Sequence, residues 1–140
     1  MSDIEQNKQR ATAWLDYVGD SDLAAMLRTT ADGWQLHGGW PGLPTGPAGV
    51  RAMVAHLSGV RQKWTVDDVI AEGDRVVVRA TNNCEQSEFL GVPAAGIRQV
   101  FTATFTFRIV DGLVHEIWRN ADDLGRLIQL GAVINVPDAH

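Results

Sequence analysis

Residues 98–118 read RQVFTATFTFRIVDGLVHEIW, and this stretch decides the fold class. Within it, phenylalanines alternate with threonines, which is the period-two pattern of a strand with one buried face. The Asp111-Gly112 pair then marks a hairpin turn. The stretch therefore predicts two antiparallel strands, over 98–109 and 113–118, that are joined by this turn.

The rest of the chain is predicted to form further strands, four helices and two loops. Earlier in the chain, period-two patterns predict strands over 34–37, 66–71 and 75–83. Apolar residues at three- and four-residue spacing predict helices over 4–18, around Leu23–Leu27, from Pro47 to Val60 and over 124–130. Asp20 or Ser21 is expected to cap the second helix, and 38–46 and 84–97 are predicted loops. The predicted helices lie mostly in the first half of the chain and the predicted strands mostly in the second half, which favours an α+β fold. We expect a curved, mostly antiparallel sheet that wraps around three helices and leaves a cavity between sheet and helices.

Composition excludes several classes of protein. A chain of 140 residues is expected to form one domain, over 1–140, and its net charge of -5 argues against nucleic-acid binding. Cys84 is the only cysteine, so no disulfide within the chain is possible, which fits a cytoplasmic protein. The polar N-terminus is unlike a signal peptide, and no window approaches the ~20 apolar residues of a membrane span. The His, Cys, Asp and Glu residues show no metal-ligand spacing.

Five short segments, in this order and spacing, resemble the SnoaL-like branch of the nuclear transport factor 2-like (NTF2-like) superfamily. They are IAEGDRVVVR (70–79), EFLGVP (88–93), FRIVDG (107–112), WRNAD (118–122) and QLG (129–131). The resemblance implies a cone-shaped α+β barrel that holds a small hydrophobic or aromatic molecule. It also implies a homodimer and, as in the cofactor-free cyclases of this branch, intramolecular aldol closure of a polyketide without metal or organic cofactor.

The resemblance implies that Asp122, four residues after the strand-ending Trp118, is the general acid/base. An aldol closure must remove a proton next to a carbonyl and stabilise the resulting oxyanion. A carboxyl group in an apolar pocket has a raised pKa and can exchange such a proton near neutral pH. Asp123 is the second candidate for this role. Alternatively, either carboxylate caps the helix over 124–130, which stabilises it by ~1 kcal/mol.

Further ligand-binding candidates come from the strands and the glycine-rich loop. Arg79 and Thr81 share one face of a strand, and the resemblance favours a cavity position over a surface one. His37 and His56 are the other titratable candidates, with packing or surface positions as the alternative. Trp34, Trp40 and Trp118 offer flat surfaces for stacking against an aromatic ligand, with core filling as the alternative.

Two departures from related enzymes bear on function. Thr81 and Asn120 stand where neighbouring epoxide hydrolases have aspartates, so water activation by their Asp-Arg-Asp arrangement is not expected. The loop over 82–87 also lacks a histidine that is common in the branch. The sequence therefore predicts a cyclase or isomerase, with three alternatives: a non-catalytic binder of small hydrophobic molecules, a relative of hydroxylases or epoxide hydrolases, and a structural domain that pairs through its sheet.

Overall fold

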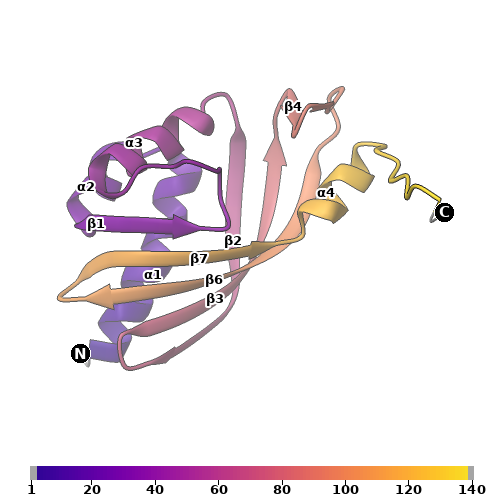
Figure 1. Cartoon of the computed structure of the whole chain (residues 1–140). Helices are drawn as coiled ribbons and strands as arrows, with labels where there is room; N and C mark the ends of the chain where they lie inside the picture. Colours follow the sequence, from indigo (N-terminus) through magenta and orange to yellow (C-terminus); the bar gives the residue numbers. More distant parts are fainter. Residues whose placement is uncertain (1–2, 139–140) are drawn as a thin grey trace.

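The computed structural model describes residues 3–138, which form helices packed on a curved sheet (Figure 1). The helices are α1 (Asp3–Asp20), α2 (Leu23–Thr29), α3 (Gly46–His56) and α4 (Asp123–Gln129). The strands are β1 (Thr30–His37), β2 (Arg61–Glu72), β3 (Arg75–Glu85), β4 (Glu88–Phe89), β5 (Val92–Pro93), β6 (Gln99–Val110) and β7 (Leu113–Ala121). Within these residues, no helix is both long and apolar enough to cross a membrane.

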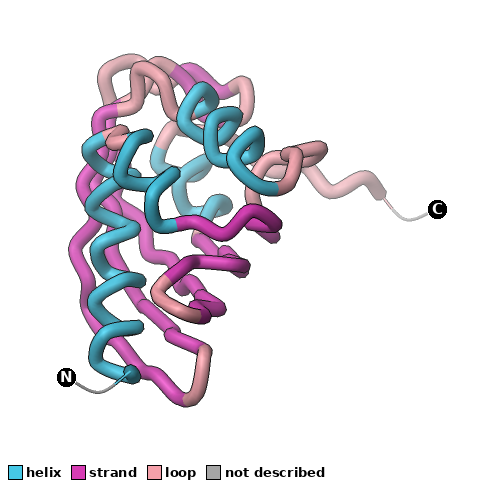
Figure 2. Tube along the Cα trace, turned by 90° about the vertical axis from the view of Figure 1, so that its left-hand side faces the viewer, coloured by secondary structure: helices cyan, strands magenta, loops and turns pink. Residues whose placement is uncertain are grey.

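The main sheet has the strand order β1-β7-β6-β3-β2, and β4 pairs with β5 in a separate small hairpin. Its neighbours are antiparallel except β1 and β7, which run parallel. The three N-terminal helices pack on one face of the sheet, as the view in Figure 2 shows. The α+β class and the mostly antiparallel sheet predicted from the sequence are confirmed.

One face of each central strand supplies the core. In β6, Phe101, Phe105 and Phe107 are buried, whereas the threonines between them are half-buried or exposed. Val76, Val78 and Ala80 of β3 are fully buried beside them. Burying a large apolar side chain contributes about 1.5–3 kcal/mol, so these alternating rows fix which face of each strand points inward.

Several element boundaries differ from those predicted. β2 begins at Arg61, so Trp64 lies within the strand. β1 extends back to Thr30, and its pairing with β7 is irregular between Thr30 and Gln35. The cap of α2 is Asp22, whose Oδ1 accepts a hydrogen bond from the backbone N–H of Ala25 at 3.1 Å. The expected cap at Asp20 or Ser21 is therefore wrong.

Candidate functional site

A cavity of about 370 Å³ lies between the inner face of the sheet, the N-terminal helices and two loops. Aromatic and aliphatic side chains form most of its wall: Trp14, Leu15, Val18, Leu36, Trp40, Met53, Leu57, Val60, Trp64, Phe89, Phe101, Phe105 and Ile117. This volume and this lining are typical of sites that hold a small, mainly apolar molecule.

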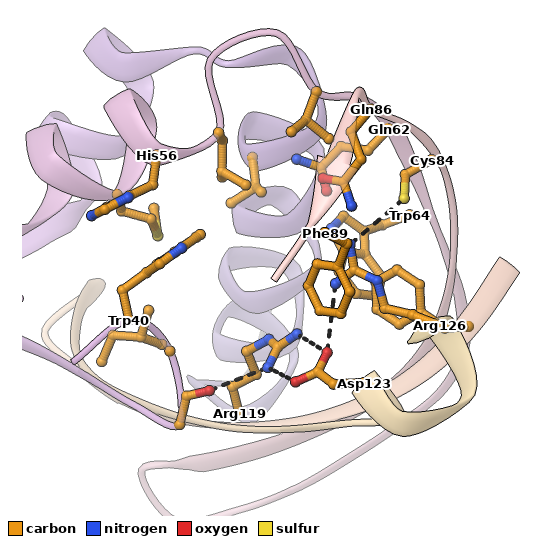
Figure 3. A pocket seen from close by; sticks show the side chains of 18 of the residues that line it. Trp40, His56, Gln62, Trp64, Cys84, Gln86, Phe89, Arg119, Asp123 and Arg126 are labelled. Carbon is orange, nitrogen blue, oxygen red and sulfur yellow. Dashed lines mark hydrogen bonds and ion pairs between the residues drawn. The ribbon is translucent and has the colours of Figure 1, made fainter. Parts of the chain in front are cut away.

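Three charged side chains occupy one part of this apolar wall (Figure 3). Arg119 donates from Nη1 to Asp123 Oδ2 at 2.9 Å and from Nη2 to Asp123 Oδ1 at 2.8 Å. Arg126 Nη1 lies 3.5 Å from the same Oδ1. The side chains are 20%, 35% and 9% exposed for Arg119, Asp123 and Arg126, so the cluster is partly withdrawn from water.

The local sequence explains how these three groups meet. Arg119 comes two residues after the buried Ile117 in β7, so both side chains point to the inner face. The chain then enters α4, where Asp123 and Arg126 are three residues apart and lie on one side of the helix. A strand followed directly by a helix therefore brings both arginines to one carboxylate.

The loop after β1 closes this part of the cavity. Gly38 has φ +81, and a Cβ atom there would lie 2.2 Å from the backbone oxygen of Arg119. Only a glycine allows this close approach of the loop to β7. The Gly38 carbonyl oxygen accepts a hydrogen bond from Arg119 Nη1 at 3.2 Å, which fixes the guanidinium from the side opposite α4.

Arg126 is held between two aromatic rings. Its guanidinium carbon lies 3.5 Å from the ring centre of Phe89 and 4.2 Å from that of Phe101. Nε donates to Gln99 Oε1 at 3.2 Å, and Nη2 lies 3.9 Å from Cys84 Sγ. Phe89 belongs to β4, so this stacking attaches the small β4–β5 hairpin to the cavity.

Burial and pairing shift the titration of this cluster in different directions. Burial alone would raise the pKa of Asp123, but hydrogen bonds and charges from Arg119 and Arg126 outweigh it and hold that pKa below its usual value. Burial raises the pKa of the Cys84 thiol more than nearby Arg126 lowers it. Burial also lowers the pKa of Arg126. Asp123 is therefore ionised at neutral pH, and Cys84 carries its proton.

The other end of the cavity is formed by Trp40 and His56. Their rings stack with centroids 4.9 Å apart and an interplanar angle of 8°. Figure 3 shows them across the cavity from Arg126 and Cys84. A flat molecule in the cavity would thus meet aromatic surfaces at this end and charged groups at the other.

The geometry and the sequence both point to one family. The SnoaL-like domain model matches residues 11–117, more than half of the 140 residues. The chain belongs to the SnoaL-like family. Its NTF2-like fold and its family, both predicted from the sequence, are confirmed.

Solved structures support the assignment. TsrD from Streptomyces laurentii is 28% identical to this SnoaL-like protein, with a TM-score of 0.82 over 95% of this chain and 100% of TsrD. A candidate SnoaL-like polyketide cyclase from Jannaschia sp. CCS1 is 27% identical, with a TM-score of 0.79 over 96% of this chain and 98% of its own. Among curated proteins, none matches this sequence significantly.

The same fold also occurs with another described activity. An LEH-like epoxide hydrolase from M. tuberculosis has a TM-score of 0.74 over 93% of this chain and 88% of its own, at 14% identity. The fold of a SnoaL-like protein therefore does not determine its reaction, and the side chains in the cavity must be considered one by one.

Asp122 does not lie where the sequence led us to expect it. It is exposed and caps α4, because its Oδ1 accepts a hydrogen bond from the backbone N–H of Gly125 at 2.9 Å. The expectation of a buried carboxyl group at position 122 is wrong, and the alternative, a helix cap, is present. The carboxylate that lines the cavity of this SnoaL-like protein is the next residue, Asp123.

Arg79 and Thr81 also lie outside the cavity. Their neighbours Val78 and Ala80 are fully buried, so strand alternation turns Arg79 and Thr81 to the outer face of β3. Arg79 is exposed there, and Thr81 donates to Asp67 Oδ2 at 2.6 Å. The prediction that they face the cavity is therefore wrong.

Five further residues were predicted to contact a ligand, and two of them line the cavity. Trp40 and His56 are part of its wall. Trp34 is fully buried in the core against Trp14, with ring centroids 6.0 Å apart. His37 and Trp118 stack on the outer face at 5.2 Å, where His37 Nε2 donates to Glu116 Oε2 at 2.6 Å. These three positions correct the predictions that placed Trp34, His37 and Trp118 against a ligand.

Sequence reasoning missed two of the residues that give the cavity its charge, Arg119 and Arg126, whereas Asp123 is the second acid/base candidate that the sequence offers. The spacing of two from the apolar Ile117, which puts both side chains on one face of the strand, is a usable signal for Arg119. The spacing of four from Arg119 to Asp123 and of three from Asp123 to Arg126 could have suggested ion pairs, but it is common on protein surfaces. Among residues 3–138, no group of three His, Cys, Asp or Glu side chains is placed to bind a metal ion.

Proposed function

We propose that this SnoaL-like protein catalyses proton transfer on a small aromatic ketone in the cavity, and that Asp123 is its general acid/base. The reaction class is cyclisation or isomerisation of a ketone. The observation that carries the proposal is an ionised carboxylate, Asp123, held between two guanidinium groups in a mainly apolar cavity. A carboxylate accepts the proton, and the positive charges stabilise the oxyanion that forms.

The first step is the removal of a proton from the carbon next to the ketone. Asp123 takes the proton, and the C–H electron pair moves into the enolate, whose negative charge lies on the ketone oxygen. Arg119 and Arg126 supply positive charge at this place, where the low exposure of both side chains strengthens the interaction. The step uses proton transfer alone and needs no cofactor.

The enolate then has two outcomes that conserve all atoms. In an isomerisation, Asp123 returns the proton to the oxygen, or to a more distant carbon when a C=C bond of the substrate is conjugated with the enolate. In a cyclisation, the enolate carbon forms a bond to a second carbonyl carbon of the same molecule, and the resulting alkoxide takes the proton from Asp123. A relative described as a candidate SnoaL-like polyketide cyclase supports the second outcome.

The lowered pKa of Asp123 limits which substrates can react. An ion-paired carboxylate is a weaker base, since the pairing stabilises its ionised form. The substrate must therefore have an acidic C–H group, next to two carbonyl groups or between a carbonyl group and an aromatic ring. Aromatic polyketides and aryl ketones meet this requirement.

The same observation favours a second candidate function, a binding protein that carries an aromatic molecule without changing it. In that case, the Arg119–Asp123–Arg126 cluster only positions the ligand. The two functions differ in one measurable property, the rate of proton exchange at the carbon next to the carbonyl group of the bound ketone.

The test uses 2-tetralone, a bicyclic aryl ketone with acidic protons, in D₂O. We expect the wild-type protein to accelerate deuterium incorporation at C1, followed by ¹H NMR. Because general acid/base catalysis contributes about 10²–10⁴-fold, Asp123→Asn should lower the rate by about this factor. Asp122→Asn preserves the cap of α4 and should leave the rate near that of the wild type.

Binding of 2-tetralone to each variant is measured in parallel by quenching of tryptophan fluorescence. Loss of exchange with binding retained assigns the proton transfer to Asp123. If Asp122→Asn abolishes exchange and Asp123→Asn does not, Asp122 is the acid/base despite its exposed position. Binding by the wild type without any acceleration shows a binding protein.

A further inference from the structure

We propose that the natural ligand of the cavity is an aromatic keto acid, whose carboxylate binds at the Arg119–Arg126 end. The inference rests on the proposed function for the location of the ligand, and it adds the ligand's charge. Three features of this end of the cavity carry it: its net charge, its hydrogen-bond donors and the apolar character of the remaining wall.

The charges at this end do not balance. Two guanidinium groups share the single carboxylate of Asp123, and the better buried of them, Arg126, is the more weakly paired. Arg119 makes two hydrogen bonds below 3.0 Å to Asp123, whereas Arg126 has its nearest Asp123 oxygen at 3.5 Å. Glu88, the other acidic residue of the lining, is exposed to solvent. A positive charge that is buried and incompletely paired favours an anionic partner.

The hydrogen bonds show the same imbalance. Within the described chain, the Nη groups of Arg126 make only long contacts, to Asp123 and, at 3.9 Å, to Cys84 Sγ. Two further donors near Phe101, Trp64 Nε1 and Gln99 Nε2, are buried without a partner among residues 3–138, against one unpartnered acceptor, Asn82 Oδ1. Unpaired donors therefore outnumber unpaired acceptors in this region, and a carboxylate presents acceptors only.

The remaining wall determines the rest of the ligand. Phe101, Phe105 and Trp64 form an aromatic wall beside the charged end, and Trp40 stacked on His56 forms the far end. Figure 3 shows these two ends facing each other across the cavity, and we place a planar ring system between them, with its ketone near Asp123 and its carboxylate near Arg126. A guanidinium binds a carboxylate through two parallel hydrogen bonds, which would also orient the ring.

The test compares 2-naphthoate with 2-naphthamide, which has the same ring and nearly the same shape but no charge. Both are titrated into the protein by isothermal titration calorimetry. We expect 2-naphthoate to bind the wild type about tenfold more tightly or better, the size of a hydrogen bond to a charged group. Arg126→Met should bring the ratio of the two affinities close to one, and Arg51→Met, at an exposed position on α3, should leave it unchanged.

The ratio is taken within each variant, so a change in stability affects both molecules alike. If Arg126→Met does not fold, Arg119→Met provides the same comparison. A wild-type ratio below about tenfold, or a ratio that survives both substitutions, overturns the inference. If 2-tetralone still exchanges with deuterium in that case, only the carboxylate assignment fails; if none of the three molecules binds, the proposed function fails as well.

Discussion

Asp122 and Asp123 are neighbours in the chain, yet different partners hold them. The carboxylate of Asp122 accepts the backbone N–H of Gly125, whereas that of Asp123 is held by two arginines at the cavity. The capping residue, Asp122, precedes the helix, and Asp123 is the first residue of α4. At this junction, the same two residues begin a helix and place a charge in the cavity.

The cap at Asp122 predicts a measurable loss of stability. Asp122→Ala removes the acceptor for the Gly125 N–H and should lower the free energy of unfolding by about 1 kcal/mol. Asp122→Asn keeps an acceptor at the same position and should change it by a few tenths at most. Urea denaturation of the two variants measures the difference. Equal stability of Asp122→Ala and the wild type would show that the cap contributes nothing.

The pairing of Asp123 predicts a pH dependence. Since the arginines hold the pKa of Asp123 below the ordinary aspartate value of about 3.9, its ionised form stabilises the folded protein above that value. The stabilisation is lost as the pH falls through the lower pKa of the folded state. The wild type should therefore exceed Asp123→Asn in free energy of unfolding most at neutral pH and progressively less in acid.

Urea denaturation at a series of pH values tests this, with Asp122→Asn as the comparison. A gap between the wild type and Asp123→Asn that stays constant down to acid pH would mean that the ion pairs of Asp123 add no stability.

The misplaced site residues have two different causes. The face of Arg79 follows from the apolar row Val76, Val78 and Ala80, since burial of that row decides the register. The family resemblance favours the cavity for Arg79, whereas this alternation places Arg79 on the outer face, where the structure has it. By contrast, nothing in the pattern could separate Asp122 from Asp123, because the start of a helix is uncertain by one or two residues.

At the scale of elements, the end of β1 is fixed by a glycine. Gly38 has a positive φ, and a side chain there would collide with the backbone oxygen of Arg119. Gly38→Ala should lower the free energy of unfolding by more than about 1 kcal/mol, the cost of the left-handed conformation alone. At Gly33 no atom lies within 4 Å of an added Cβ, so Gly33→Ala is the matched control. Equal losses in the two variants would show that the contact with Arg119 is not tight.

A ring contact joins the β4–β5 hairpin to the charged end of the cavity. Phe89→Ala removes the ring over Arg126, a contact of about 0.5–2 kcal/mol. Hydrogen–deuterium exchange in residues 86–97 should accelerate as a result, whereas Leu90→Ala, at a side chain 71% exposed, should leave it unchanged. The account of this hairpin is wrong if the two variants exchange alike.

The long elements could be predicted, and the short ones could not. β6 and α1 have strong periodicity over many residues, so their type and buried face follow from the sequence. β4 and β5 are two residues each and depend on contacts with residues distant in the sequence, such as Arg126. The parallel pairing of β1 with β7 is also a long-range contact, and no local pattern indicates it.

At the scale of the whole molecule, the outer face of the sheet has no assigned role. It carries Arg79, Thr104 and Trp118, and the homodimer expected from the resemblance stays a prediction. Light scattering should give twice the chain mass of 15.3 kDa if the protein is a dimer. A mass of 15.3 kDa itself would show a monomer and would leave the cavity site unaffected.

The central claim is that a small aromatic molecule binds in the cavity on the inner face of the sheet, and not on the outer face. Trp40 and Trp64 line the cavity, and Trp118 lies on the outer face of the sheet. Their indole N–H groups therefore respond to a ligand on one side of the sheet or the other. The most direct measurement is a titration of ¹⁵N-labelled protein with 2-tetralone, followed by the indole N–H signals. We expect the signals of Trp40 and Trp64 to shift and that of Trp118 to stay. A shift of Trp118 with Trp40 and Trp64 unchanged would contradict the claim.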